Sequence, residues 1–307
     1  MTEDAATRTG FARSTRAPTP EGDSRPFGAH LRMSWWKPLL IIPVLPVVMI
    51  LLQILLYQGV ALIDGSDDPL APTITPLKFL AVNLSIGITG VFAVVLTFRL
   101  ARVSWQTVLS LPRRFDRKRL LQYLGGAAVL VALGITVARI VAPEDLGWSE
   151  FGVSGTTVAL LVTVALTTPM QAAGEELMFR GAILPAAASW TRTIRPALAL
   201  GVAVSSPAFM FVHGSADPWL AAYYVVFGVS TGLMMIISRG LEASIAFHVA
   251  NNLLTTTLNT IFADGGAFVI DRSAGVAGLS LVVLTAVNIA MVLLVWALER
   301  RRRSTAG

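Results

Sequence analysis

The sequence predicts an all-α integral membrane protein, a bundle of about eight transmembrane helices. Three observations support this fold class. Hydrophobic residues make up 54% of the 307 residues, and the mean hydropathy is +0.69. Charged residues make up only 14%, whereas soluble domains carry about 25%. The apolar residues gather in segments of about 20 residues, the length that a helix needs to cross a bilayer.

The predicted spans follow one another along the chain with polar loops between them. They are approximately residues 38–63, 77–99, 121–142, 156–179, 196–213, 219–237, 241–262 and 276–298. Several contain Pro, Gly or Ser, which membrane helices tolerate. We therefore expect a single transmembrane domain over residues 36–300, without a convincing internal repeat.

Both ends of the chain are polar. Residues 1–35 are rich in Arg, Thr, Pro and Gly and lack the apolar core of a signal peptide, so we expect a disordered cytoplasmic tail. His30 lies in this tail and is expected to be solvated. Residues 301–307 are expected to form a short basic tail.

Charge in the loops predicts the orientation. Basic loops such as "RRFDRKR" alternate with acidic loops such as "DGSDDP" and "APEDLGWSE", and basic loops mark the cytoplasmic side. We expect a multi-pass protein of the cell membrane with both termini in the cytoplasm. These topology signals account for the net charge of +6, so we expect no nucleic-acid partner. The preference for Arg over Lys is typical of a GC-rich bacterial genome.

Three apolar segments in the second half of the chain carry ionisable or amide side chains. They are "GEELMFR" (174–180), "FMFVH" (209–213) and "HVANN" (248–252). Such groups cost about 2.5–3.5 kcal/mol each at membrane depth and usually mark a functional site. The absence of cysteine excludes a cysteine nucleophile and cysteine-ligated zinc. A carboxylate, two imidazoles and an amide can instead activate a water molecule.

Helical spacing predicts how the acidic segment is arranged. Glu176 and Arg180 are four residues apart, so they share a helix face and are expected to form an ion pair. Glu175 is rotated from Glu176 by about 100°, so it points elsewhere. The ion pair would hold the helix in place while Glu175 faces the site.

The same spacing recurs in the other two segments. Phe209 and His213 are four apart, which would put the aromatic ring beside the imidazole, and His248 shares a face with Asn252. Three helices could thus present one carboxylate, two imidazoles and one amide to a shared polar cavity. The side chains expected there are Glu175, His213, His248 and Asn252.

The Glu175 helix must continue past its apolar segment if Glu175 and His213 are to lie at one depth. The sequence has no strong break before Trp190, although Pro185 should kink the helix. With an end at Trp190, Glu175 lies about 22 Å and His213 about 26 Å from the cytoplasmic ends of their helices. His248 lies nearer its own cytoplasmic end, so its helix must be tilted or start further inside.

At these residues the sequence resembles the CPBP family of CAAX proteases and bacteriocin-processing enzymes, also called the Abi family, which is similar to the eukaryotic type II CAAX prenyl protease. The family pattern is EExxxR, FxxxH and HxxxN on separate membrane helices. In this chain the pattern is Glu175-Glu176 with Arg180, Phe209 with His213, and His248 with Asn252. The resemblance covers about residues 156–260.

The resemblance implies an intramembrane endopeptidase that acts on a membrane-associated peptide or protein. Glu175 would be the base that activates water, helped by His213. His248 and Asn252 would bind the scissile carbonyl and its oxyanion. The supporting residues would be Glu176, Arg180 and Phe209.

The resemblance leaves the cofactor open, because family members are described both as metalloproteases and as metal-independent glutamate proteases. Glu175, His213 and His248 could form a two-His, one-carboxylate zinc site. The HExxH signature of many zinc proteases is absent, and Asn252 suits an oxyanion donor better than a zinc ligand. We therefore expect no obligatory metal.

Three other functions remain open from the sequence. A rhomboid-like serine protease could use Ser154 in "GVSG" or Ser230 in "GVSTG", although neither has an evident histidine partner and the second motif also suits close helix packing. A proton-coupled transporter could use intramembrane Glu and His, but the repeats typical of transporters are not evident. A catalytically silent membrane scaffold is the third alternative.

Overall fold

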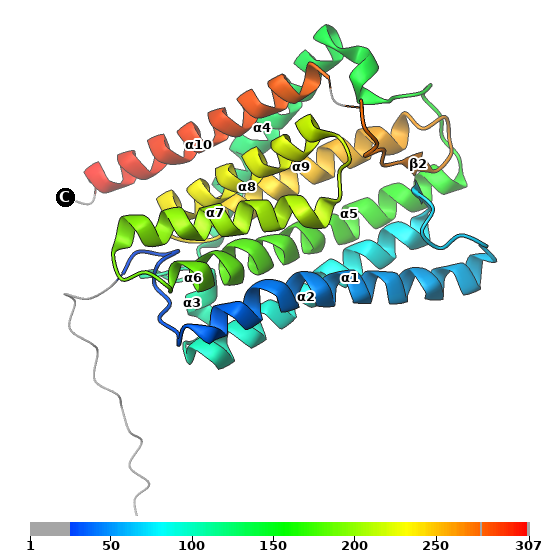
Figure 1. Cartoon of the computed structure of the whole chain (residues 1–307). Helices are drawn as coiled ribbons and strands as arrows, with labels where there is room; N and C mark the ends of the chain where they lie inside the picture. Colours follow the sequence, from blue (N-terminus) through cyan, green and yellow to red (C-terminus); the bar gives the residue numbers. More distant parts are fainter. Residues whose placement is uncertain (1–24, 277, 306–307) are drawn as a thin grey trace, which may run out of the picture.

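The computed structural model describes residues 25–276 and 278–305, which form an α-helical bundle (Figure 1). The long helices in this part of the chain are α1 (Trp36–Asp64), α2 (Pro76–Ala101), α4 (Arg117–Val141), α5 (Gly155–Glu176) with its continuation, α7 (Ile194–His213), α8 (Pro218–Ser238), α9 (Glu242–Ile261) and α10 (Ser280–Thr305). Short elements connect them: β1 (Thr73–Ile74), α3 (Trp105–Leu109), η2 (Pro143–Leu146) and β2 (Phe268–Val269). The predicted all-α membrane bundle is confirmed.

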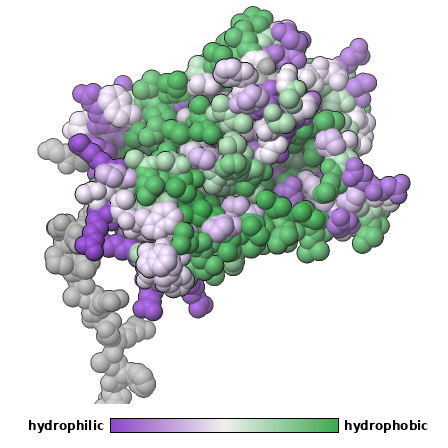
Figure 2. All heavy atoms as spheres, viewed as in Figure 1, coloured by the Kyte–Doolittle hydropathy of each residue, from purple (hydrophilic) through white to green (hydrophobic). Residues whose placement is uncertain are grey.

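Seven helices of the described chain are long and apolar enough to cross a membrane, and α9 is not among them. The N-terminal half of α9, residues 242–250, is buried inside the bundle. Apolar side chains of the outer helices, such as Leu51, Val129 and Leu166, are exposed. Figure 2 shows apolar residues across the middle of one face and hydrophilic residues towards its two ends. This distribution fits a bilayer around the bundle.

The two ends of the described chain lie at the same end of the bundle (Figure 1). At the opposite end, β1 pairs antiparallel with β2, with Thr73 opposite Val269 and Ile74 opposite Phe268. The helix α10 continues to Thr305, through most of the segment predicted to be a basic tail. Because its two ends lie at the same end of the bundle, the described chain passes along the bundle an even number of times.

The segment before α1 differs from the predicted disordered tail. Residues 1–24 lie outside the described part, but Phe27, Ala29 and Leu31 are fully buried. His30 is not solvated as predicted: its ring stacks on Phe27 with centres 4.8 Å apart, and burial lowers its pKa to about 4. The prediction was wrong here because these apolar side chains are buried against the bundle.

The helix that carries Glu175 continues beyond its apolar segment, as predicted. The helix α5 passes directly into the π-helix η3 (Leu177–Ile183) and then into α6 (Leu184–Ala188). Pro185 lacks an N–H and crowds the carbonyl of the preceding turn, and the wider π-turn lies directly before it. Ser205 on α7 donates to the Phe179 carbonyl at 2.9 Å. A π-turn inside a helix is frequently found at a functional site.

The helices α2 and α5 cross closely beside Glu175 because both have glycine at the contact. A Cβ added to Gly90 would lie 2.4 Å from the Gly174 Cα, and one added to Gly174 would lie 2.7 Å from the Ile86 carbonyl oxygen. Either added carbon would force the two backbones apart. The crossing therefore fixes the part of α5 directly before the paired glutamates.

We expect Gly90→Ala to lower the thermal stability of the purified protein. Overpacking costs about 1–3 kcal/mol, and the better helix propensity of Ala returns at most about 1 kcal/mol. The matched control is Gly125→Ala on α4, where an added carbon meets nothing within 4 Å. Equal unfolding temperatures for the two variants would contradict the close crossing.

Candidate active site

The antiparallel helices α5 and α9 bring Glu175, Glu176 and His248 together. The His248 Nδ1 lies 2.8 Å from the Glu176 Oε1, and the His248 Nε2 lies 3.5 Å from the Glu175 Oε2. An ionised carboxylate only accepts hydrogen bonds, so Nδ1 carries a proton and donates it to Glu176. The imidazole therefore bridges two consecutive carboxylates, and all three side chains are buried.

The predicted ion pair between Glu176 and Arg180 is present, with 3.3 Å between Glu176 Oε1 and Arg180 Nη1. Both side chains are fully buried, and the guanidinium carbon lies 4.5 Å from the Phe209 ring centre. The expectation that Glu176 points away from the site needs correction, because the same oxygen also accepts from His248. The two nitrogens of one imidazole can reach both glutamates although their side chains diverge.

Gln171 connects Asn252 to Glu175, a role that the sequence analysis missed. The Asn252 amide donates to Gln171 Oε1 at 3.1 Å, and the Gln171 amide donates to Glu175 Oε1 at 2.7 Å. Gln171 lies one turn before Glu175 on α5, and Asn252 lies one turn after His248 on α9, so the two contacts are successive layers of one helix pair. The spacing of four from Gln171 to Glu175 was the signal that could have identified it.

These contacts form one polar network through the centre of the bundle. In order, its members are Asn251, Asn252, Gln171, Glu175, His248, Glu176 and Arg180. Within the described residues, each of the two glutamates has one enclosed oxygen without a hydrogen-bond partner, Glu175 Oε2 and Glu176 Oε2. Buried polar atoms without a partner are rare, so these two oxygens are the acceptors left available in the network. Of the two, Glu175 Oε2 lies 3.5 Å from His248 Nε2.

His213 lies beside this network rather than in it. Its Nδ1 lies 2.8 Å from the Phe209 carbonyl oxygen, which places the proton on Nδ1 and leaves Nε2 as an acceptor when the ring is neutral. The His213 ring lies beside the Phe209 ring, as predicted, with the two ring centres 4.3 Å apart. The Tyr224 ring centre lies 4.2 Å from that of His213. Phe209 also lies 6.0 Å from the His248 ring centre, so it contacts both imidazoles.

The four residues predicted to share a site are therefore brought together to different degrees. Glu175 and His248 are adjacent, and Asn252 reaches Glu175 through Gln171. Throughout the part of the chain that the structure describes, no three His, Asp or Glu side chains are arranged to hold a metal ion. The possible zinc ligands Glu175, His213 and His248 are thus not assembled as a metal site.

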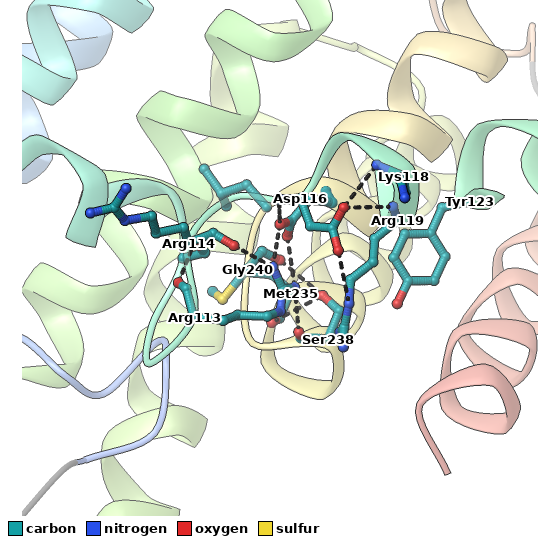
Figure 3. Close-up of polar contacts among 12 residues, drawn as sticks. Arg113, Arg114, Asp116, Lys118, Arg119, Tyr123, Met235, Ser238 and Gly240 are labelled. Atoms are coloured by element: carbon teal, nitrogen blue, oxygen red, sulfur yellow. Dashed lines mark hydrogen bonds and ion pairs between the residues drawn. The ribbon is translucent and has the colours of Figure 1, made fainter. Parts of the chain in front are cut away.

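A buried ion pair at the start of α9 explains the depth of His248. Glu242 is fully buried and pairs with Arg113, whose Nη2 lies 2.9 Å from Glu242 Oε2. The same nitrogen lies 2.8 Å from the Ser238 carbonyl oxygen (Figure 3). The Asp116 N–H donates to Glu242 Oε1 at 2.7 Å. The segment between α3 and α4 thus covers the α8–α9 turn. The helix α9 therefore starts inside the protein, whereas the sequence analysis had left open whether it starts inside or is tilted.

Of the two serines considered as nucleophiles, Ser154 has a structural role. Ser154 is the N-cap of α5: its Oγ accepts from the backbone N–H groups of Thr156 and Thr157 and donates to the Gly265 carbonyl. Ser230 lines an apolar groove between α8 and α10 with residues such as Leu233. Neither hydroxyl contacts a histidine in the described chain.

Comparison with known proteins agrees with the motifs. No curated protein and no solved structure matches the chain. Residues 156–254 match the family described as "Type II CAAX prenyl endopeptidase Rce1-like". The matched segment runs from the start of α5 into α9 and includes all three motifs. This segment, about a third of the chain, is therefore similar to the type II CAAX prenyl endopeptidases.

Proposed function

We propose that this protein is an intramembrane endopeptidase in which Glu175 activates a water molecule for attack on a peptide bond. The observation that carries the proposal is the enclosed Glu175 Oε2, which has no hydrogen-bond partner in the described chain and lies 3.5 Å from His248 Nε2. Gln171 holds the other carboxylate oxygen at 2.7 Å. One oxygen is thus fixed, and the other is available to accept a proton.

In the proposed reaction, the water gives a proton to Glu175 Oε2 while its oxygen adds to the carbonyl carbon of the scissile bond. His213 assists as an acceptor through Nε2, since its Nδ1 is engaged by the Phe209 carbonyl. The proton on Glu175 then passes to the leaving nitrogen, the C–N bond breaks, and a carboxylic acid and an amine are released. General-base assistance of this kind contributes typically about 10²–10⁴-fold to the rate.

The oxyanion formed on the carbonyl oxygen is stabilised by donors from α9. His248 acts with both ring nitrogens protonated, so that Nδ1 donates to Glu176 and Nε2 donates to the oxyanion. The Asn252 amide, held one turn away by Gln171, donates to the same region of the substrate. One oxyanion donor is worth about 10²–10³-fold in rate. Glu176 and Arg180 keep the donor helix and the base helix in register.

The proposed substrate is a membrane-associated peptide or small protein, because the site lies among membrane-spanning helices. A comparison of the membrane proteome with and without this protein tests the proposal, and new termini that appear only with the protein are expected. A full set of unchanged termini would favour a scaffold. A proton-linked flux that depends on Glu175 would favour a transporter.

We also propose that the protein is a multi-pass protein of the cell membrane with both termini in the cytoplasm. Reporter fusions after Asp64 and Pro143, in the acidic loops, are expected to read as outside, and a fusion after Arg303 as inside. The expectation follows from the side preference of basic loops. An outside signal from the fusion after Arg303 would contradict the proposed orientation.

A further inference from the structure

An arginine in the loop between β2 and α10 lies over the end of α7 that carries His213. The loop is fixed at two points. The strand β2, directly before it, pairs with β1, and the Arg272 carbonyl accepts from the Ala216 N–H at 2.8 Å. Since Ala216 is three residues after His213, the backbone of Arg272 is held close to that histidine.

The side chain of Arg272 joins the group of residues around His213. It interacts electrostatically with His213 on α7, Tyr224 on α8 and Tyr57 on α1. The His213 and Tyr224 rings are in contact, with centres 4.2 Å apart, and Tyr224 also interacts electrostatically with Glu175. Arg272 therefore belongs to the side of the site that His213 forms.

Arg272 differs from Arg113 and Arg119, two other partly buried arginines, in having no carboxylate beside it. Arg113 pairs with Glu242, and Arg119 pairs with Glu299. Across residues 25–276 and 278–305, no carboxylate lies within ion-pair distance of Arg272. Its Nε is enclosed and has no hydrogen-bond partner there. A partly buried charge is costly unless it is paired, so this site suits an anionic ligand.

We propose that Arg272 binds a carboxylate of the substrate on the His213 side of the site, an inference that rests on the proposed peptidase function. A guanidinium presents parallel N–H donors that match a planar carboxylate. In a peptide, that carboxylate comes either from the C-terminus or from an Asp or Glu side chain. Tyr224 and Tyr57 add hydroxyl groups beside the same cation.

The test measures binding separately from cleavage, in full-length protein carrying Glu175→Gln. Three fluorescent peptides that share one apolar sequence are compared. The first is the free acid, the second is its C-terminal amide, and the third is an amide that carries an Asp side chain at its terminal residue. At least one of the acidic peptides is expected to bind about 10- to 100-fold more tightly than the neutral amide. The identity of that peptide distinguishes the two sources of the carboxylate.

Adding Arg272→Gln is expected to remove this preference, and Arg272→Lys to retain part of it. The control is Arg139→Gln on α4, an exposed arginine, which should keep the full preference. Equal binding of all three peptides, or an equal loss for acidic and neutral peptides with Arg272→Gln, would overturn the proposal. If the wild-type protein cleaves the neutral amide but binds no acidic peptide more tightly, the Arg272 proposal alone fails. If no peptide is bound or cleaved, both proposals fail.

Discussion

Replacing Glu175 by Gln is expected to lower the rate of peptide cleavage by about 10²–10⁴-fold, the typical contribution of a general base. The amide keeps the size of the side chain and can still bond to Gln171, which contacts the other side-chain oxygen. It cannot accept the proton of the attacking water. The measurement is the initial rate of cleavage of a substrate found by comparing termini, with purified protein in lipid vesicles.

The matched control is Glu144→Gln, which removes the same charge from an exposed position in η2. This variant should cleave at the wild-type rate. Unfolding temperatures of both variants should stay close to that of the wild type, which separates loss of chemistry from loss of fold. Full activity of the Glu175 variant would show that another group activates the water.

Replacing Arg180 by Ala is expected to lower stability as well as activity. Arg180 and Glu176 are both fully buried, and removal of one partner from a buried ion pair costs about 3–5 kcal/mol. The contact of the guanidinium with Phe209 is lost at the same time. Glu176 keeps its bond to His248, so the network is weakened at one end. The measurement is the unfolding temperature of purified protein in detergent.

The control for Arg180→Ala is Arg139→Ala, because Arg139 is exposed on α4. Its unfolding temperature should match that of the wild-type protein. If the Arg180 variant is as stable as this control, Arg180 is not the structural counter-charge that the buried pair indicates. A variant that is stable but inactive would instead assign Arg180 a direct role in the reaction.

The sequence could predict contacts within one helix, because helical spacing fixes them. The pairing of Glu176 with Arg180 and the contact of Phe209 with His213 both follow from a spacing of four residues. The continuation of the Glu175 helix could be predicted for a similar reason, since no strong break follows in the chain.

Contacts between helices could not be predicted in the same way, because they depend on how one helix is placed against another. The bond from Asn252 to Gln171 requires the antiparallel register of α5 and α9. The pairing of Arg113 with Glu242 joins residues 129 positions apart. Neither contact has a signature in the sequence, where Gln171 lies outside the three motifs and Arg113 is one of several basic residues in the loop "RRFDRKR".

The prediction for the segment before α1 was wrong for another reason. Its composition is polar, and composition predicts disorder, but three apolar residues decide its placement: Phe27, Ala29 and Leu31 are fully buried. Too few apolar residues are present to give a periodic pattern. These three residues are buried because they pack against a surface that other parts of the chain form, and the local sequence does not show that surface.

The central claim is that a water molecule activated by the Glu175 carboxylate, and not a serine hydroxyl, attacks the peptide bond. The most direct test is the cleavage rate of a protein in which both Ser154 and Ser230 are replaced by Ala. Because Ser154 caps α5 and loss of such a cap costs about 1 kcal/mol, the rate is measured well below the unfolding temperature of the variant. Cleavage at the wild-type rate is predicted, whereas a folded but inactive serine variant, beside a Glu175→Gln variant that still cleaves, would contradict the claim.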